Sequence, residues 1–244
     1  MGGALILPYW TAAGGNDSLI TIRNDSDVAT AAKVHWLGSD GERLLSYNLY
    51  LDARQVWTGA VAVIDGSVQL IGDNSSCQLS GDSPGSVGVT TDPRLLDAIR
   101  GSIEIIQVAS TSEVSPLASA GVWLPCEQLR ARFNDGVWSV DPQQGLLRPN
   151  QMMSASVSII SVGIGTMNSV SATALAGFSD MPQHSLPMSA LPDLSSASDA
   201  DAQEGQVRSL ICERQGCRYD AWNRPIDAVD AALRTLYFIA DFDL

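Results

Sequence analysis

Four cysteines and two histidines are the residues of this chain whose types and spacing suggest chemistry most directly. Cys77 and Cys126 stand alone, whereas Cys212 and Cys217 form a C-x4-C pair. Four cysteines allow three pairings, and the most economical one joins the two isolated residues to each other and closes the C-x4-C pair locally. On the chain-entropy model, the longer loop would stabilise the fold by about 4 kcal/mol and the shorter by about 2 kcal/mol. Four free, buried thiols are the alternative.

A G-x-S-x-G pattern at residues 81–85, with His184 downstream, has the order of a serine hydrolase. The residue after the serine would have to offer its backbone N–H to the oxyanion, and Pro84 has none. The other histidine, His35, alternates with apolar strand neighbours, which predicts a solvated side chain on the opposite face. We therefore expect no catalytic residues and rank a hydrolase below the binding and structural classes.

Two other groups of residues suggest small ligands or a polymer. Asp25 and Asp27 lie in a predicted turn and would suit Ca²⁺, although their spacing is not that of an EF-hand and a solvated turn is the alternative. Four aromatic residues would stack on sugars if exposed, as in carbohydrate-binding modules, and would otherwise belong to the core. These aromatic residues are Tyr9, Trp10, Tyr50 and Trp57. The sequence thus suggests Ca²⁺ and a polysaccharide as ligands and no other cofactor.

The elements that would position these residues are mostly short strands. Apolar and polar residues alternate along the first 110 positions, and polar turns interrupt them every eight to twelve residues. The predicted strands are 20–23, 32–37, 45–51, 55–64, 67–71 and 103–108. A second β stretch at 154–159 is expected to pair with 169–178. This pattern predicts an all-β fold, an antiparallel immunoglobulin-like sandwich.

Few segments have helical signals, and the composition of the chain changes towards its end. Short helical insertions are predicted at 92–101 and 125–134, and an amphipathic helix from Pro225. Residues 181–207 are acidic and rich in proline and serine, which predicts a linker or loop, exposed and mobile over 183–205. We therefore expect three parts. They are a β-sandwich domain at 1–180, the linker at 181–207 and a C-terminal helical segment at 208–244.

Composition excludes some partners and favours a location. Fourteen basic against 27 acidic residues give a net charge of −13, the wrong sign for binding nucleic acid. No run of about 18 apolar residues occurs, so we expect no transmembrane segment. Lys33 is the only lysine, and the acidic, serine-rich composition favours a place outside the cell. The uncharged segment 5–7 should pair with a sheet, of its own chain rather than of a neighbour.

Several motifs between residues 5 and 180 resemble a family. The motifs are Leu7-Pro8-Tyr9-Trp10-Thr11, the Gly14-Gly15 segment up to Leu19, and Asn48-Leu49-Tyr50-Leu51 followed by Val56-Trp57-Thr58. They are similar to those of a group of exported proteobacterial proteins of unknown function. This resemblance implies export, and hence a secreted, periplasmic or cell-surface location in which a Cys77–Cys126 disulfide would persist. Chains of that group are typically longer, which leads us to expect a truncation after Leu244.

These observations lead to a ranked hypothesis. The first is a secreted or cell-surface structural or adhesive β-sandwich protein, a subunit of an extracellular oligomer or fibre that self-associates or binds other surface components. A carbohydrate-binding module is the alternative. A surface protein stabilised by a divalent cation, or a hydrolase, ranks third.

Overall fold

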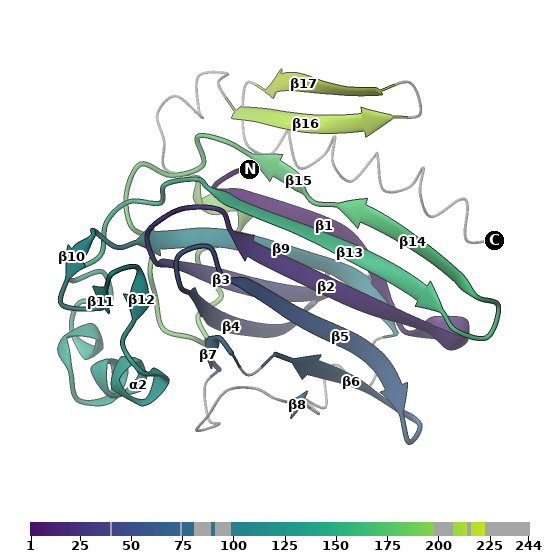
Figure 1. Cartoon of the computed structure of the whole chain (residues 1–244), viewed down its shortest axis with the longest axis horizontal. Helices are drawn as coiled ribbons and strands as arrows, with labels where there is room; N and C mark the ends of the chain where they lie inside the picture. Colours follow the sequence, from purple (N-terminus) through teal and green to yellow (C-terminus); the bar gives the residue numbers. More distant parts are fainter. Residues whose placement is uncertain are drawn as a thin grey trace.

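The structure, a computed structural model, is an all-β fold built from two large antiparallel sheets that face each other (Figure 1). It describes residues 1–39, 41–73, 75–80, 89–90, 99–197, 207–213 and 216–222. The predicted all-β class and the predicted sandwich are confirmed at this level.

The first sheet has six strands, and the chain enters it early. Its order is β14-β13-β2-β5-β6-β8. The bounds are β14 Thr166–Ser171, β13 Met153–Ser161, β2 Asn16–Asn24, β5 Val56–Ile64, β6 Ser67–Gly72 and β8 Val89–Thr90. A 3-10 turn, η1 (Ala13–Gly15), leads into β2. β14 lies at one edge of this sheet.

The second sheet has eight strands, in the order β17-β16-β15-β1-β9-β3-β4-β7. The bounds are β17 Gly216–Trp222, β16 Val207–Glu213, β15 Thr173–Leu175, β1 Ala4–Thr11, β9 Arg100–Ser110, β3 Thr30–Gly38, β4 Arg43–Leu51 and β7 Cys77–Leu79. β1 lies between β15 and β9, so the apolar segment 5–7 does pair within its own chain.

The predicted strand 169–178 is divided between the two sheets. Its first part belongs to β14, which pairs with β13 in the six-stranded sheet. The chain then passes Ala172, whose N–H donates to the carbonyl of Ala155, and continues as β15 beside β1 in the other sheet. One continuous extended segment therefore joins the two sheets along this side of the sandwich.

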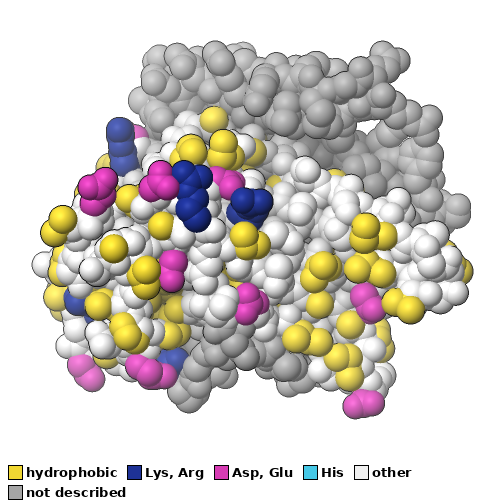
Figure 2. All heavy atoms as spheres, viewed as in Figure 1, with side chains coloured by type: hydrophobic (Ala, Val, Ile, Leu, Met, Phe, Trp, Pro, Cys, Tyr) yellow, Lys and Arg dark blue, Asp and Glu magenta, His cyan; other side chains and the backbone are white. Residues whose placement is uncertain are grey.

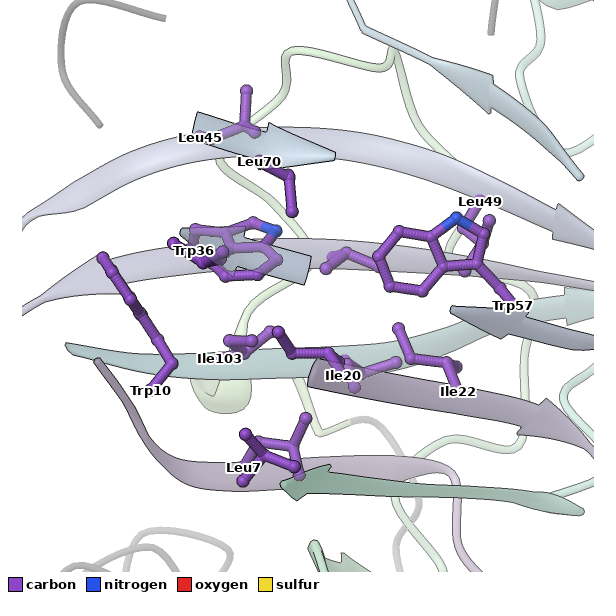
Figure 3. Packing of buried hydrophobic residues seen from close by; sticks show 14 of the residues in the cluster. Leu7, Trp10, Ile20, Ile22, Trp36, Leu45, Leu49, Trp57, Leu70 and Ile103 are labelled. Atoms are coloured by element: carbon purple, nitrogen blue, oxygen red, sulfur yellow. The ribbon is translucent and has the colours of Figure 1, made fainter. Parts of the chain in front are cut away.

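The main core fills the space between the sheets (Figure 3). Alternate residues of each strand point into it, as the period of two requires. Trp10, Trp36 and Trp57 are fully buried there, and the rings of Trp10 and Trp36 meet edge to face with centroids 5.7 Å apart. The core thus lies where the predicted alternation places it.

The outer face of the eight-stranded sheet is also buried, which alternation alone does not predict. A second apolar cluster covers it, formed with helix α2 (Cys126–Asn134), the 3-10 turn η2 (Val137–Ser139) and a three-stranded sheet. The three strands are β10 Val114–Ser115, β11 Ala118–Ser119 and β12 Val122–Trp123. Figure 1 shows α2 and these strands grouped at one end of the molecule. The predicted helix at 125–134 is confirmed.

A disulfide joins β7 of the sheet to the start of α2. Cys77 and Cys126 are bonded, with an S–S distance of 2.01 Å and a sequence separation of 49 residues. This confirms the first of the two predicted pairings. Cys212 and Cys217 are opposite each other in the register of β16 and β17, but their side chains lie outside the described ones.

Residues 183–197, named the strap here, belong to the predicted linker, and some of them are exposed as predicted whereas others are buried. The strap is irregular apart from the 3-10 turn η3 (Leu194–Ser196), yet it packs on the outer face of the eight-stranded sheet. His184 and Leu194 are buried in it. Its backbone supplies hydrogen bonds to polar side chains of the sheet, so it is held without a large apolar surface of its own. Residues 198–205 lie outside the described ones.

The expected helical segment at 208–244 is also corrected in part. Residues 207–213 and 216–222 form the antiparallel pair β16 and β17, which extends the eight-stranded sheet beyond β15. The physical reason is that the exposed edge of β15 offers unpaired backbone groups, which a strand satisfies and a helix does not. The predicted helices at 92–101 and from Pro225 fall outside the described residues, apart from residues 99–101.

Gly101 in β9 tests how tightly the strands pack. A Cβ at this position would lie 1.8 Å from the carbonyl oxygen of Leu37 on β3, so Gly101→Ala must displace the backbone. We expect the free energy of unfolding to fall by about 2 kcal/mol or more in urea titrations, as for an overpacked core. Gly163→Ala is the control, since a Cβ there meets nothing within 4 Å. Equal stability of the two variants would contradict the packing described.

Candidate functional site

A group of buried ionisable and polar side chains lies between β3, β4 and the strap. Lys33 is opposite Asn48, and His35 is opposite Ser46, in the register of β3 and β4. All four side chains point away from the main core, because Val34 and Trp36, which alternate with them, face inward. The strap closes over this face, and all four residues are buried.

Lys33 is held by backbone oxygens of the strap. Its Nζ donates to the carbonyls of Leu186, at 2.6 Å, and Pro187, at 3.1 Å. Among the described residues, Lys33 forms no ion pair with a carboxylate. Burial, with a smaller contribution from the positive charge of Arg43, lowers the pKa of Lys33 to about 7. The amine is therefore partly neutral near neutral pH.

His35 and His184 are both neutral and have fixed tautomers. His35 Nε2 donates to the carbonyl of Pro192 at 2.8 Å, so its Nδ1 accepts from the hydroxyl of Ser46 at 2.7 Å. In the same way, His184 Nδ1 donates to the carbonyl of Pro142 at 2.6 Å and Nε2 accepts from Tyr50 at 2.7 Å. Burial lowers the pKa of each histidine to about 4.

His184 also lies in an aromatic enclosure. The ring of Trp138 is 4.6 Å away, that of Phe133 5.3 Å and that of Tyr50 5.8 Å, measured between centroids. Phe133 belongs to α2, Trp138 to η2 and Tyr50 to β4. His184 thus connects the strap, the sheet and the helix at one point.

A carboxyl group lies beside His35 at the margin of this cluster. Glu104 is opposite His35 in the register of β9 and β3 and is half-buried. Burial, together with the negative charge of Asp193, raises its pKa to about 7. Asp193, in the strap, is 3.8 Å from the guanidinium of Arg43.

Perturbed pKa values of this kind are common at acid–base sites. The two described cavities lie elsewhere. One of about 430 Å³ lies between the sheets near Leu5, Arg23 and Ala172. The other, of about 380 Å³, lies beside the Cys77–Cys126 disulfide. Lys33, His35 and His184 are hydrogen-bonded inside the protein, whereas Asn48 Oδ1 is buried without a hydrogen-bond partner among the described residues.

The aromatic residues proposed for sugar stacking are not brought together. Trp10 and Trp57 are buried in the main core, whereas Tyr50 is buried in the second cluster on the other face of the eight-stranded sheet. Only Tyr9 is half-exposed. The expectation of an exposed platform is therefore wrong, and the alternative of core residues is correct, because both faces of the sheet are covered.

The two aspartates proposed for Ca²⁺ each bind an arginine. Asp25 is 3.3 Å from Arg23 and accepts from Ser154 at 2.5 Å, and Asp27 accepts from Arg54 at 2.8 Å. The bond to Arg54 lowers the pKa of Asp27. Across the described ranges, no group of three or more histidine, cysteine or acidic side chains could hold a metal ion.

Analysis of the sequence missed Lys33, Glu104 and the burial of both histidines. One signal was available for Lys33, since the only lysine of the chain follows Ala32 and precedes Val34 inside a strand. His35 was expected to be solvated, which is wrong because the strap covers its face of the sheet. Apart from His184, the strap bonds to the sheet mainly through backbone carbonyls, which leave no pattern in the sequence.

Comparison of the chain with protein-family models, with curated proteins and with solved structures gave no match in any of the three. The described helices are too short or too polar to traverse a bilayer.

Tyr50→Phe measures the bond between sheet and strap. It removes the hydroxyl that donates to His184 and leaves Nε2 buried without a donor, so the free energy of unfolding should fall by about 2 kcal/mol. Tyr47→Phe is the matched control, because the hydroxyl of Tyr47 is also buried but is at most weakly placed to accept from Trp36. It should change stability by less than about 0.5 kcal/mol in the same urea titrations. Equal losses in the two variants would show that the Tyr50–His184 bond contributes nothing.

Proposed function

We propose that this protein is a secreted or cell-surface structural or adhesive protein, and that it works as a subunit of an extracellular oligomer. One observation carries the proposal. The described side chains best suited to chemistry, Lys33, His35 and His184, are buried and fasten the strap to the sheet. Lys33 and His35 donate to carbonyls of the strap, and His184 of the strap accepts from Tyr50 of β4. Groups used in this way stabilise a scaffold and do not meet a substrate.

The Cys77–Cys126 disulfide supports the proposed secreted or cell-surface location. Structural disulfides persist in oxidising surroundings, such as the periplasm and the outside of the cell. A net charge of −13 favours solubility through self-repulsion. The resemblance of the Leu7–Thr11 and Asn48–Leu51 motifs to exported proteins points the same way.

We further propose that the sandwich is immunoglobulin-like. The support is that the chain crosses between the sheets repeatedly, from β2 to β3 and from β4 to β5, as Greek-key sandwiches do. An experimental structure in which the β2–β5 pair and the β3–β4 pair belonged to one sheet would contradict this.

Calcium and polysaccharide have less support as ligands. The aspartates of the proposed Ca²⁺ site bind arginines, and the aromatic platform is buried. We therefore place the function in the scaffold itself and in its contacts with other surface components.

Cell fractionation tests the proposed location and electron microscopy the proposed assembly. In cells that produce the protein naturally, we expect the chain in the periplasmic, surface or medium fraction, with Cys77 and Cys126 resistant to alkylation without reductant. Extracellular protease should degrade it in intact cells if it is at the surface. Native material should contain discrete oligomers or filaments. A cytoplasmic chain with both thiols reactive would contradict the proposal.

A further inference from the structure

The edge strand β14 has few of the features that normally prevent strands from pairing. Among the described residues, β14 pairs only with β13, and five of its six residues are exposed. The pairing runs without a bulge from Ser156 opposite Ser171 to Ser161 opposite Thr166. β14 therefore forms an edge of the six-stranded sheet that no bulge interrupts (Figure 1).

The register shows which backbone groups face outward. The N–H of Ala172 donates to the carbonyl of Ala155, and these two residues continue the register of β14 and β13. In an antiparallel pair, such hydrogen-bonded positions alternate with positions that bond away from the partner strand. The backbone groups of Asn168 and Val170 thus face β13, whereas those of Met167, Ser169 and Ser171 face the free edge.

Charge is absent along this edge. Natural edge strands are commonly protected by charged residues, proline or bulges. No Asp, Glu, Lys or Arg and no proline occurs between Asn150 and Ser179, which includes both strands of the β13–β14 hairpin. Exposed apolar side chains accompany the edge, since Val162 is 75%, Ile164 76% and Met167 65% exposed. Figure 2 shows hydrophobic and neutral side chains predominating at the right of the view, towards which the hairpin extends in Figure 1.

The lack of charged residues along the edge makes a second copy of the chain an acceptable occupant. A second copy carries the same net charge of −13, so two copies repel each other except where a surface is uncharged. The β14 edge is such a surface. Because it presents outward N–H and carbonyl groups in alternation, an antiparallel copy of the same strand satisfies them reciprocally.

We propose that β14 pairs antiparallel with β14 of a second copy, so that the six-stranded sheet continues through a two-fold dimer. This names the partner within the proposed function and rests on it. Symmetry restricts the register, because outward-bonding residues must be opposite one another and side chains must remain on matching faces. Centring the axis on Ser169 places Ser169 opposite its own counterpart and Met167 opposite Ser171 of the second copy, which uses all three outward positions.

A proline substitution isolates the edge. Ser169→Pro removes an outward N–H and blocks close approach, but takes no backbone hydrogen bond from β13. It also removes the bond between the hydroxyls of Ser169 and Ser158, and the alanine control removes the same bond. Ser169→Ala, the control, keeps the N–H. By sedimentation velocity of the full chain, we expect the native protein and Ser169→Ala to dimerise in the micromolar range, and Ser169→Pro to dimerise at least about tenfold more weakly. Circular dichroism and the thermal midpoint verify that each variant is folded.

A second variant covers the case in which proline disturbs the hairpin. Ser169→Lys keeps the N–H but places two like charges opposite each other across the axis, which should weaken the dimer more at low salt than at high salt.

A native protein that is monomeric at about 100 μM would overturn the inference, as would a Ser169→Pro variant that dimerises normally. If β14 instead binds a strand of another protein, the native protein alone stays monomeric, which also overturns the inference. Cell fractionation is independent of both, so a surface-located monomer would refute the dimer and leave the proposed location standing.

Discussion

Lowering the pH from 6.5 to 4 should reduce the free energy of unfolding by on the order of 3 kcal/mol for each of the two buried histidines. Burial lowers the pKa of His35 and of His184 from 6.5 to about 4. Between these pH values the unfolded chain takes up protons that the folded chain does not. The stabilisation is therefore complete above pH 6.5 and is lost as the pH falls to about 4.

Two other groups modify this profile, with opposite effects. The pKa of Glu104 is raised to about 7. Between pH 4.5 and 7, the folded chain therefore holds a proton on Glu104 that the unfolded chain has lost. The contribution of Glu104 to the free energy of unfolding thus decreases as the pH rises. Glu104→Gln should steepen the acid-induced loss. The lowered pKa of Lys33 adds stability as the pH rises from about 7 towards 10.5.

The measurement is a series of urea titrations from pH 4 to 7.5 on the native chain and on His184→Phe. The variant should be less stable at pH 7, because Tyr50 loses its acceptor. Between pH 4.5 and 6.5, however, its unfolding should take up about one proton fewer than that of the native chain, so its free energy of unfolding should fall less steeply with pH. Parallel profiles for the two proteins would show that His184 does not titrate in this range.

Replacing both Cys77 and Cys126 by alanine should lower the free energy of unfolding by about 4 kcal/mol, the value that the chain-entropy model gives for this loop. The physical reason is that the bond restricts the unfolded chain across a sequence separation of 49 residues and fixes α2 against β7. Denaturation in urea without reductant measures the loss.

The second cysteine pair provides the matched control. Cys212 and Cys217 are opposite each other in the β16–β17 register, and a bond between them would close only a short loop. Replacing both by alanine should therefore cost no more than about 2 kcal/mol. If this pair proved the costlier to remove, loop closure would not explain the stability of the protein.

The strands could be predicted from local sequence because alternation and turn residues act over a few positions. β2 to β6, β9 and β13 follow the predicted segments, and Pro125 correctly marked the start of α2. The strap could not be predicted in this way. Its prolines and serines and its lack of aromatic residues indicate a solvated loop, and most of its bonds to the sheet use backbone carbonyls, which every residue possesses.

The candidate site was missed for a related reason. Alternation distinguishes the two faces of a strand. It correctly placed His35 on the other face of β3 from Trp36, and Tyr50 on the other face of β4 from Tyr47. Alternation does not predict whether the face that points away from the main core is exposed to solvent. Here the second face is covered by α2 and the strap, segments distant in sequence, so residues expected at the surface are buried.

The position of β1 has a consequence for folding during synthesis. Ala4 pairs with Ile106 on one side and with Leu175 on the other, so β1 occupies an interior place in its sheet and is made before both of its neighbours. Both neighbours are made much later, and pairing across such separations is slow. Until β9 and β15 exist, Leu5, Ile6 and Leu7 have no native partner, and a chain released early presents an unprotected apolar strand to chaperones and to other nascent copies.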